Sequence, residues 1–293
     1  MKQLVGRRWL LLLGVAALVV VGGALTLGVA WRYRHRLRPA YDMTRAVLDN
    51  GHVERTADYH NVLFIHHSTG HNLIAQGNVR ELFTAAGYAF WDHDYNPTGL
   101  TRPDGTPAGY SYNIPRDNTD PDGLAQLFAQ RAYAWPVNAL SGALQHDVIV
   151  FKSCFPVSDI ASQEQLETYK RYYLGIRDVI DQHPDHLFIA MSPPPLVPES
   201  TTPENAVRAR EFANWLTSDE YLSGHPNLYT FDFFDQLAEG DRASPDYSML
   251  RAAYRPEVEG DSHPNQLANE TVGPRFVEFI IASIEAYRAA DNG

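Results

Sequence analysis

Short apolar runs and longer amphipathic segments alternate along the chain from residue 59 to residue 290. The runs Asp147–Phe151 and Leu187–Met191 are almost continuously apolar, which is typical of parallel strands covered on both faces. In Gln163–Gln182, apolar residues recur every three or four positions and predict a helix. The predicted strands are 62–66, 88–91, 147–151, 187–191 and 228–231, and the predicted helices are 72–86, 124–134, 163–182, 205–216 and 267–288. This alternation predicts an α/β fold with a mostly parallel sheet and helices on both of its faces.

The first 38 residues have a different pattern. Trp9–Trp31 is an uncharged run of 23 residues, which as a helix would span roughly 34 Å, enough to cross the hydrocarbon core of a bilayer. Tryptophan at both ends suits the membrane interface. We therefore expect a single transmembrane anchor, with cleavage at Gly28-Val-Ala30 as the alternative. Basic residues flank the run on both sides, and the very short leading tail favours an extracytoplasmic catalytic domain.

The pattern divides the chain into an anchor with basic flanks (1–38), a polar, partly helical connector (39–58) and one α/β domain (59–290). Within the domain, Asp92–Gly123 is a long segment rich in Asn, Asp, Pro and Gly. A loop of this length in a compact domain is usually functional. Its tyrosines, among them Tyr110 and Tyr112, either line a carbohydrate cleft or pack within the loop.

Charge separates the two ends of the chain. Residues 1–38 contain seven basic residues and no acidic one, which leaves 17 basic and 35 acidic residues in the remainder. The chain after residue 38 is therefore strongly acidic. This charge excludes nucleic acid as a partner and favours a neutral or cationic substrate, or a glycan. Cys154 is the only cysteine, so an intrachain disulfide and a cysteine-based zinc site are both excluded. We expect no cofactor.

Ser68 stands where the first apolar strand ends and a helix begins. In α/β folds this position places a side chain in the crevice at the carboxyl edge of the sheet, next to helix N–H groups that stabilise an anion. Near the C-terminus, the loop Gly260-Asp-Ser-His-Pro-Asn265 supplies Asp261 and His263. An early serine with a late acid and histidine is one of the chain orders that form a Ser-His-Asp triad. The alternative is that Ser68 caps a helix and that the later loop is an ordinary polar turn.

Three motifs in this order resemble those of the SGNH (GDSL-type) hydrolase superfamily. They are His66-His-Ser-Thr69, Asn96-Pro-Thr-Gly99 and Asp261-Ser-His-Pro264. The resemblance covers residues 59–290 and implies a flavodoxin-like three-layer α/β/α fold. It also implies hydrolysis of acyl esters of lipids, polysaccharides or small molecules, with Ser68 as nucleophile, His263 as base and Asp261 as its acid partner.

The chain departs from the family pattern in three places. His66 and His67 stand where the family has Gly-Asp before the nucleophile. Asp261 lies two residues before His263 instead of three, and no asparagine follows the third strand to complete the oxyanion hole. The resemblance assigns oxyanion donors to the amides of Ser68 and Gly99. The missing third donor is expected within Lys152–Ser158, and its candidates are Lys152, Ser153 and Ser158.

Other functions fit the same residues. A metal ion would suit the histidines near Ser68 (His60, His66, His67 and His71) together with Asp92, His93 and Asp94 at the end of the next strand. Neighbouring strand residues point to opposite faces, however, so His66 and His67 cannot both enter one site in a regular strand. A non-catalytic, membrane-tethered protein on a degenerate hydrolase fold is a second alternative. An O-acyltransferase, in which a sugar or lipid alcohol replaces water, is a third.

Overall fold

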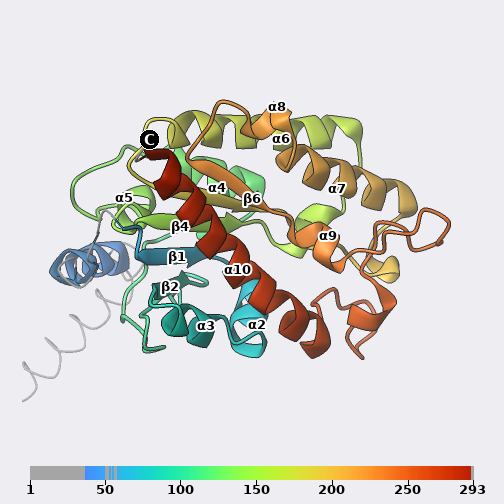
Figure 1. The fold of residues 1–293 in the computed structure, drawn as a ribbon, viewed down its shortest axis with the longest axis horizontal. Helices are drawn as coiled ribbons and strands as arrows, with labels where there is room; N and C mark the ends of the chain where they lie inside the picture. Colours follow the sequence, from blue (N-terminus) through green and yellow to red (C-terminus); the bar gives the residue numbers. More distant parts are fainter. Residues whose placement is uncertain (1–36, 50–52, 54, 56–57, 292–293) are drawn as a thin grey trace, which may run out of the picture.

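The computed structural model describes residues 37–291 apart from 50–52, 54 and 56–57. In this part of the chain six strands form one sheet (Figure 1). The strands are β1 (Asn61–Ile65), β2 (Ala89–His93), β3 (Leu100–Thr101), β4 (Val148–Lys152), β5 (Leu187–Met191) and β6 (Leu228–Phe231). The predicted mixed α/β fold with a mostly parallel sheet is therefore confirmed.

The strand order is β3-β2-β1-β4-β5-β6, and only the two-residue β3 runs antiparallel to its neighbour. Without β3, the parallel strands follow the order 2-1-3-4-5 that doubly wound sheets of the flavodoxin type use. The chain leaves β1 toward β2 on one side and later returns to β4 on the other. The carboxyl ends of β1 and β4 thus form the switch point at which such folds bind ligands.

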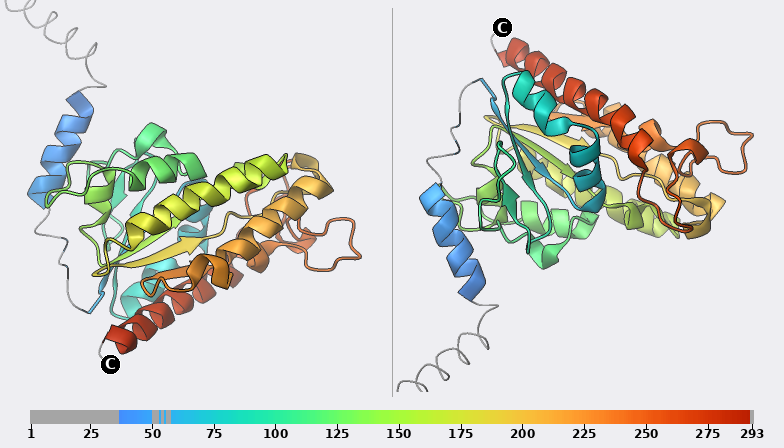
Figure 2. Two further views of the ribbon diagram at one scale, coloured as in Figure 1. Left: turned by 90° about the horizontal axis from the view of Figure 1, so that it is seen from above. Right: turned by 90° about the horizontal axis from the view of Figure 1, so that it is seen from below.

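Helices cover both faces of the sheet (Figure 2). The helices are α2 (Ser68–Gln76), α3 (Val79–Ala85), α4 (Pro121–Phe128), α5 (Ala139–Ala143), α6 (Gln163–Ile180), α7 (Pro203–Leu216), α8 (Asp219–Leu222), α9 (Phe233–Leu237) and α10 (Gln266–Asp291). Short 3₁₀ turns lie at Pro115–Asp117, Phe155–Ser158, Pro198–Ser200 and Ala252–Tyr254. A further helix, 37–49, precedes β1.

The alternation of side chains along each strand divides the core into two clusters. Val62 and Phe64 of β1 pack with side chains of α2, α3 and α10. Leu63 and Ile65 pack with α4, α5, α6 and α7 on the opposite face. Because every position of β1, β4 and β5 is buried, these strands carry the continuous apolar runs seen in the sequence.

One predicted helix needs correction. The predicted helix 72–86 is two helices, because Asn78 has a left-handed backbone (φ 53°) and starts α3 in a new direction. The predicted partly helical character of the connector 39–58 is confirmed, since residues 37–49 are helical. The predicted membrane span, Trp9–Trp31, lies outside the described residues. Along the described residues, none of the helices combines the length and apolar character that a bilayer crossing requires.

Candidate active site

Ser68 is the first residue of α2, three residues after the end of β1. His67 is the N-cap, with an extended backbone, and its carbonyl oxygen accepts hydrogen bonds from the N–H groups of Gly70 (2.8 Å) and His71 (3.0 Å). These bonds close the first turn of the helix around Ser68. The N–H of Ser68 itself belongs to the first helical turn, whose amides have no acceptor within the helix, so it is available to an anion.

The structure brings Ser68, His263 and Asp261 together in one chain of hydrogen bonds. The Nε2 atom of His263 lies 2.8 Å from the Oγ of Ser68, and its Nδ1 lies 2.6 Å from the Oδ1 of Asp261. The same Oδ1 accepts the backbone N–H of His263 at 3.0 Å. The two-residue spacing therefore does not prevent the contact, because the carboxylate folds back over the turn that joins it to the histidine.

Local contacts fix the charge and the orientation of this pair. Partial burial acts to raise the pKa of Asp261, but hydrogen bonds from the backbone and ring of His263, and the charge of that ring, outweigh it. The pKa therefore lies below its ordinary value. Phe155 packs edge-on against the His263 ring, with centroids 4.9 Å apart. Asp261 is thus held as a carboxylate facing an imidazole of fixed orientation.

Two glycines allow the helix that carries Ser68 to approach the helix that follows His263. A Cβ on Gly77 of α2 would lie 2.9 Å from the Cα of Gly273 in α10, which real side chains do not tolerate. Beside this contact, the side-chain amide of buried Asn269 donates to the Oε1 of Gln76 (2.7 Å) and to the carbonyl oxygen of Pro264 (3.0 Å). Asn269 therefore connects the end of α2 to the loop that holds the histidine.

His66 is buried against α2. A Cβ on Gly70 would come within 2.6 Å of the Cγ of His66, so only glycine lets α2 rest on this ring. The Nε2 of His66 lies 3.2 Å from a carboxylate oxygen of Asp92, whose other oxygen pairs with Arg80. Burial acts to raise the pKa of Asp92, but His66 and Arg80 outweigh it and the pKa lies below its usual range.

His67 points to the other face of the sheet, as strand alternation requires. Its ring stacks on Tyr95 at 3.9 Å between centroids. Burial, followed by the charges of Lys152, His66 and His93, lowers the pKa of His67 to about 3, so the ring is neutral at physiological pH.

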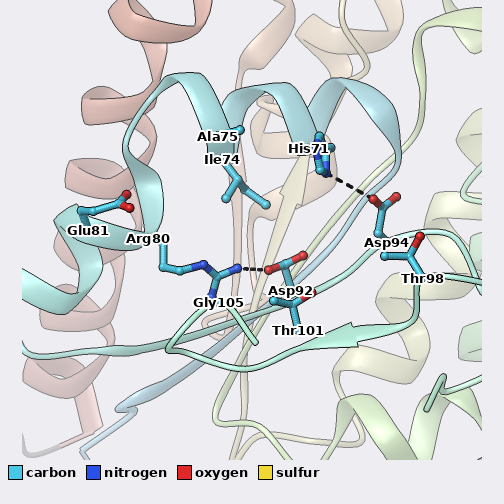
Figure 3. Close-up of a pocket in the computed structure, with 10 residues that line it drawn as sticks. All are labelled: His71, Ile74, Ala75, Arg80, Glu81, Asp92, Asp94, Thr98, Thr101 and Gly105. Carbon is cyan, nitrogen blue, oxygen red and sulfur yellow. Dashed lines mark hydrogen bonds and ion pairs between the residues drawn. The ribbon is translucent and has the colours of Figure 1, made fainter. Parts of the chain in front are cut away.

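The structure does not bring the alternative metal ligands together. His66 and His67 diverge, and His71 pairs with Asp94 at 3.4 Å (Figure 3). Among the described residues, the group of possible ligands whose donor atoms come close to one another is His183, Asp185 and His186. These three residues follow α6 and precede β5, at the opposite edge of the sheet from Ser68.

The other predicted oxyanion donors are already engaged. The N–H of Gly99 donates to the carbonyl oxygen of Tyr95 (2.7 Å) in a turn that requires the positive φ of glycine (75°). The ammonium group of Lys152 donates to the carbonyl oxygen of Ser153 (3.2 Å). Ser153 bonds to the hydroxyl of Tyr173, and Ser158 to the carbonyl of Pro194. The amide of Ser68, in the first turn of α2, stays a predicted donor.

A pocket of about 420 Å³ opens at the triad. It is lined by Ser68, His71, Asn72, Asp94, Tyr95, Asp261 and His263, and none of these is aliphatic. A second pocket of about 300 Å³ adjoins it, shares His71 and Asp94, and extends to Arg80 and Asp92 (Figure 3). Arg80 and Asn269 were not among the predicted site residues. Asp94, which directly follows β2, was predicted as a possible metal ligand but not as part of the pocket at Ser68.

Comparisons with known proteins give little beyond the fold. No family model matches the chain, and no curated protein matches it. Among solved structures, the chain is similar to a candidate acylhydrolase from Bacteroides fragilis at 10% identity and a TM-score of 0.47. The match covers 82% of this chain and 96% of that protein. Likeness at this level carries no argument about activity.

Proposed function

We propose that this protein is a serine hydrolase that cleaves O-acyl esters, with Ser68 as nucleophile, His263 as general base and Asp261 as the partner of the histidine. The observation that carries the proposal is the chain of hydrogen bonds at 2.8 and 2.6 Å that joins the three side chains. Nucleophile, base and orienting acid in contact define the arrangement that activates a serine.

In the first half-reaction, Nε2 of His263 removes the proton of the Ser68 hydroxyl as Oγ bonds to the ester carbonyl carbon. The resulting oxyanion accepts a hydrogen bond from the Ser68 N–H and is stabilised by the amino end of α2. When the intermediate collapses, the ester C–O bond breaks and His263 protonates the departing alcohol. In the second half-reaction, His263 deprotonates a water molecule as its oxygen bonds to the acyl carbon. When this intermediate collapses, the bond from the acyl carbon to Oγ breaks, His263 returns the proton to Oγ, and the carboxylic acid leaves.

The lining of the pocket supports a short acyl group on a polar alcohol. A long hydrocarbon chain gains free energy by burying apolar surface, and the pocket at Ser68 contains no aliphatic side chain. The carboxylates of Asp94 and Asp261 disfavour an anionic substrate and accept hydrogen bonds from hydroxyl groups. An acetyl ester of a glycan or of another hydroxyl-rich alcohol fits these properties.

The family assignment belongs to the same proposal. We assign the chain to the SGNH hydrolases as a divergent member. The 2-1-3-4-5 order of the parallel strands supports this, as does the serine after the first of them. The Asp261-Ser-His-Pro264 loop before the last helix agrees with it as well.

An O-acyltransferase is the second candidate, and the adjoining pocket favours it specifically. An acceptor alcohol held beside His71 and Asp94 would compete with water for the same acyl-enzyme. Adding glycerol or free sugars to the assay separates the two functions, because a transferase forms a new ester while a hydrolase releases only the acid.

The test is hydrolysis of p-nitrophenyl esters, from acetate to octanoate, by the purified full chain. We expect acetate to be preferred, Ser68→Ala to reduce kcat by at least about 10⁴-fold, and Ser223→Ala, at an exposed serine far along the chain, to change nothing. A fluorophosphonate probe should label the parent protein and the Ser223 variant but not Ser68→Ala. Retained activity in Ser68→Ala would remove the assignment, and absence of both activity and labelling in the parent would favour the non-catalytic alternative.

A further inference from the structure

Three of the exposed apolar side chains of helix 37–49 lie along one narrow face. Leu37, Tyr41 and Leu48 are 54%, 55% and 73% exposed. They are four and eleven residues apart, and a helix turns by about 100° per residue, so all three project within about 40° of one another. Large apolar residues scattered singly on a surface need no explanation, but these three share one face of one helix and form a stripe, with exposed Thr44 between Tyr41 and Leu48.

The opposite face of the same helix is packed on the domain. Asp42 and Ala46 are buried, and Ala46 belongs to the core. Asp49 accepts hydrogen bonds from Arg102 and from the hydroxyl of Tyr110, both at 3.0 Å. These contacts with the α/β domain fix the orientation of helix 37–49 and keep the stripe on the side that faces away from the domain.

We propose that Trp9–Trp31 spans a membrane, as its sequence predicts, and that this stripe, Leu37–Tyr41–Leu48, lies in the interfacial layer of the same membrane. Only five residues separate Trp31 from Leu37, and three of them are arginines. Arg38 and Arg45 are exposed on the helix itself, next to the stripe. An apolar stripe bordered by basic residues is the pattern of helices that lie flat on an anionic membrane.

A second copy of the chain fits the stripe less well than a membrane does. A stable protein interface buries about 800 Å² on each partner, and three side chains on one helix supply only a fraction of this area. The basic border would also bring like charges together across a symmetric contact. A lipid surface has neither disadvantage.

The contact between the stripe and the membrane determines the direction in which the Ser68 pocket opens. Helix 37–49 leads into the amino end of β1, whereas Ser68 follows its carboxyl end, and the parallel strands between them measure about 17 Å. Figures 1 and 2 show the helix (blue) at the end of the molecule opposite α9. If the function proposed above holds, the Ser68 pocket opens away from the bilayer. It then receives esters from the aqueous side and not lipids of the membrane to which the protein is anchored.

The test uses the full chain in vesicles of phosphatidylcholine and phosphatidylglycerol, with an environment-sensitive fluorophore on single introduced cysteines. Buried Cys154 is replaced by serine in every variant. We expect the fluorophore at Leu48→Cys to be quenched by lipids that carry a nitroxide on the acyl chain. Met43→Cys, on another face of the same helix, and Leu267→Cys, which is 54% exposed at the start of α10, are the matched controls and should not be quenched.

Equal quenching at residues 43 and 48, or none at 48, would overturn the proposal, and so would disulfide crosslinking between two copies through Leu48→Cys. Tyr41→Cys provides the same readout if the Leu48 variant does not fold. In the same vesicles, release of fatty acid from the surrounding phospholipid would contradict the inferred orientation of the site. Absence of all esterase activity, with quenching at 48 intact, would instead remove the proposed function and leave the membrane contact standing.

Discussion

The Nε2 atom of His263 lies 2.8 Å from the Oγ atom of Ser68, although 195 residues separate the two in the chain. The fold produces this contact by two routes. β1 places Ser68 at the carboxyl edge of the sheet, and the close approach of α2 and α10 at Gly77 and Gly273 brings the preceding histidine loop to the same point. The geometry of the site therefore depends on helix packing as much as on the catalytic side chains.

The first prediction concerns Asp261. Replacing it by asparagine keeps the shape of the side chain but removes the charge that stabilises the imidazolium and selects the ring tautomer. We expect Asp261→Asn to lower kcat by about 10⁴-fold with little change in KM. Glu259→Gln, two residues earlier and exposed, is the control. A loss of less than about tenfold in Asp261→Asn would show that Ser68 and His263 act as a dyad.

The second prediction concerns Gly70. In Gly70→Ala the new methyl group would meet the His66 ring at 2.6 to 2.9 Å, so α2 or the ring must move. We expect a loss of about 1–3 kcal/mol in the free energy of unfolding, together with reduced esterase activity because Ser68 is carried on α2. Gly175→Ala in α6 is the matched control. Its methyl group meets nothing within 4 Å, so it should stabilise by about 0.5–1 kcal/mol. Urea unfolding of both variants measures the difference.

The central sheet and the position of Ser68 at the end of the first strand could be predicted from the sequence because both depend on local signals. A continuous apolar run such as Leu187–Met191 reports burial on both faces, and the observed strand has the predicted bounds. Asp261 and His263 stand two residues apart, so their contact is a property of one loop. The short strand β3 gave no such signal, since its two residues are fixed by pairing with Asp92 and His93.

The oxyanion donors could not be predicted in the same way. Whether an N–H or a hydroxyl is free depends on the acceptor that folding places beside it, and Gly99, Ser153 and Ser158 each acquired one from another part of the structure or from the same turn. The burial of Tyr110 and Tyr112 could not be predicted from the sequence for the same reason. Both are core residues, 2% and 4% exposed, so these two pack within the loop and do not line a carbohydrate cleft.

The third prediction concerns stability in acid. Burial lowers the pKa of His93 to about 4 and that of His146 to about 3, from an ordinary value of 6.5. At a pH between the folded and the unfolded pKa of each histidine, the unfolded chain binds a proton that the folded protein does not. The free energy of unfolding must therefore fall as the pH drops below 6.5. At pH 5 the loss is on the order of 2 kcal/mol for each of the two residues.

Urea unfolding at pH 7, 6 and 5 measures this slope before most carboxylates titrate. His146→Leu should have a shallower pH dependence than the parent protein, whatever its absolute stability, because one titrating group is gone. His60→Gln, at an exposed histidine, should keep the slope of the parent protein. A slope that is unchanged in His146→Leu would contradict the assignment of buried, neutral imidazoles.

The fourth prediction concerns Asn269, whose amide donates to Gln76, Pro264 and Asn265. Because it joins α2 to the histidine loop without touching the pocket, it is a positioning residue. We expect Asn269→Ala to lower kcat by about 10- to 100-fold through misplacement of His263 relative to Ser68, with KM almost unchanged, and to cost about 1–3 kcal/mol of stability. Gln266→Ala, exposed at the start of the same helix, should change neither kcat nor stability.

Two outcomes separate a positioning role from a purely structural one. If Asn269→Ala is less stable but keeps the kcat of the parent protein at temperatures where it is still folded, the residue supports only the fold. A reduced rate of fluorophosphonate labelling at Ser68 in the still-folded variant would show that it sets the geometry of the nucleophile and its base.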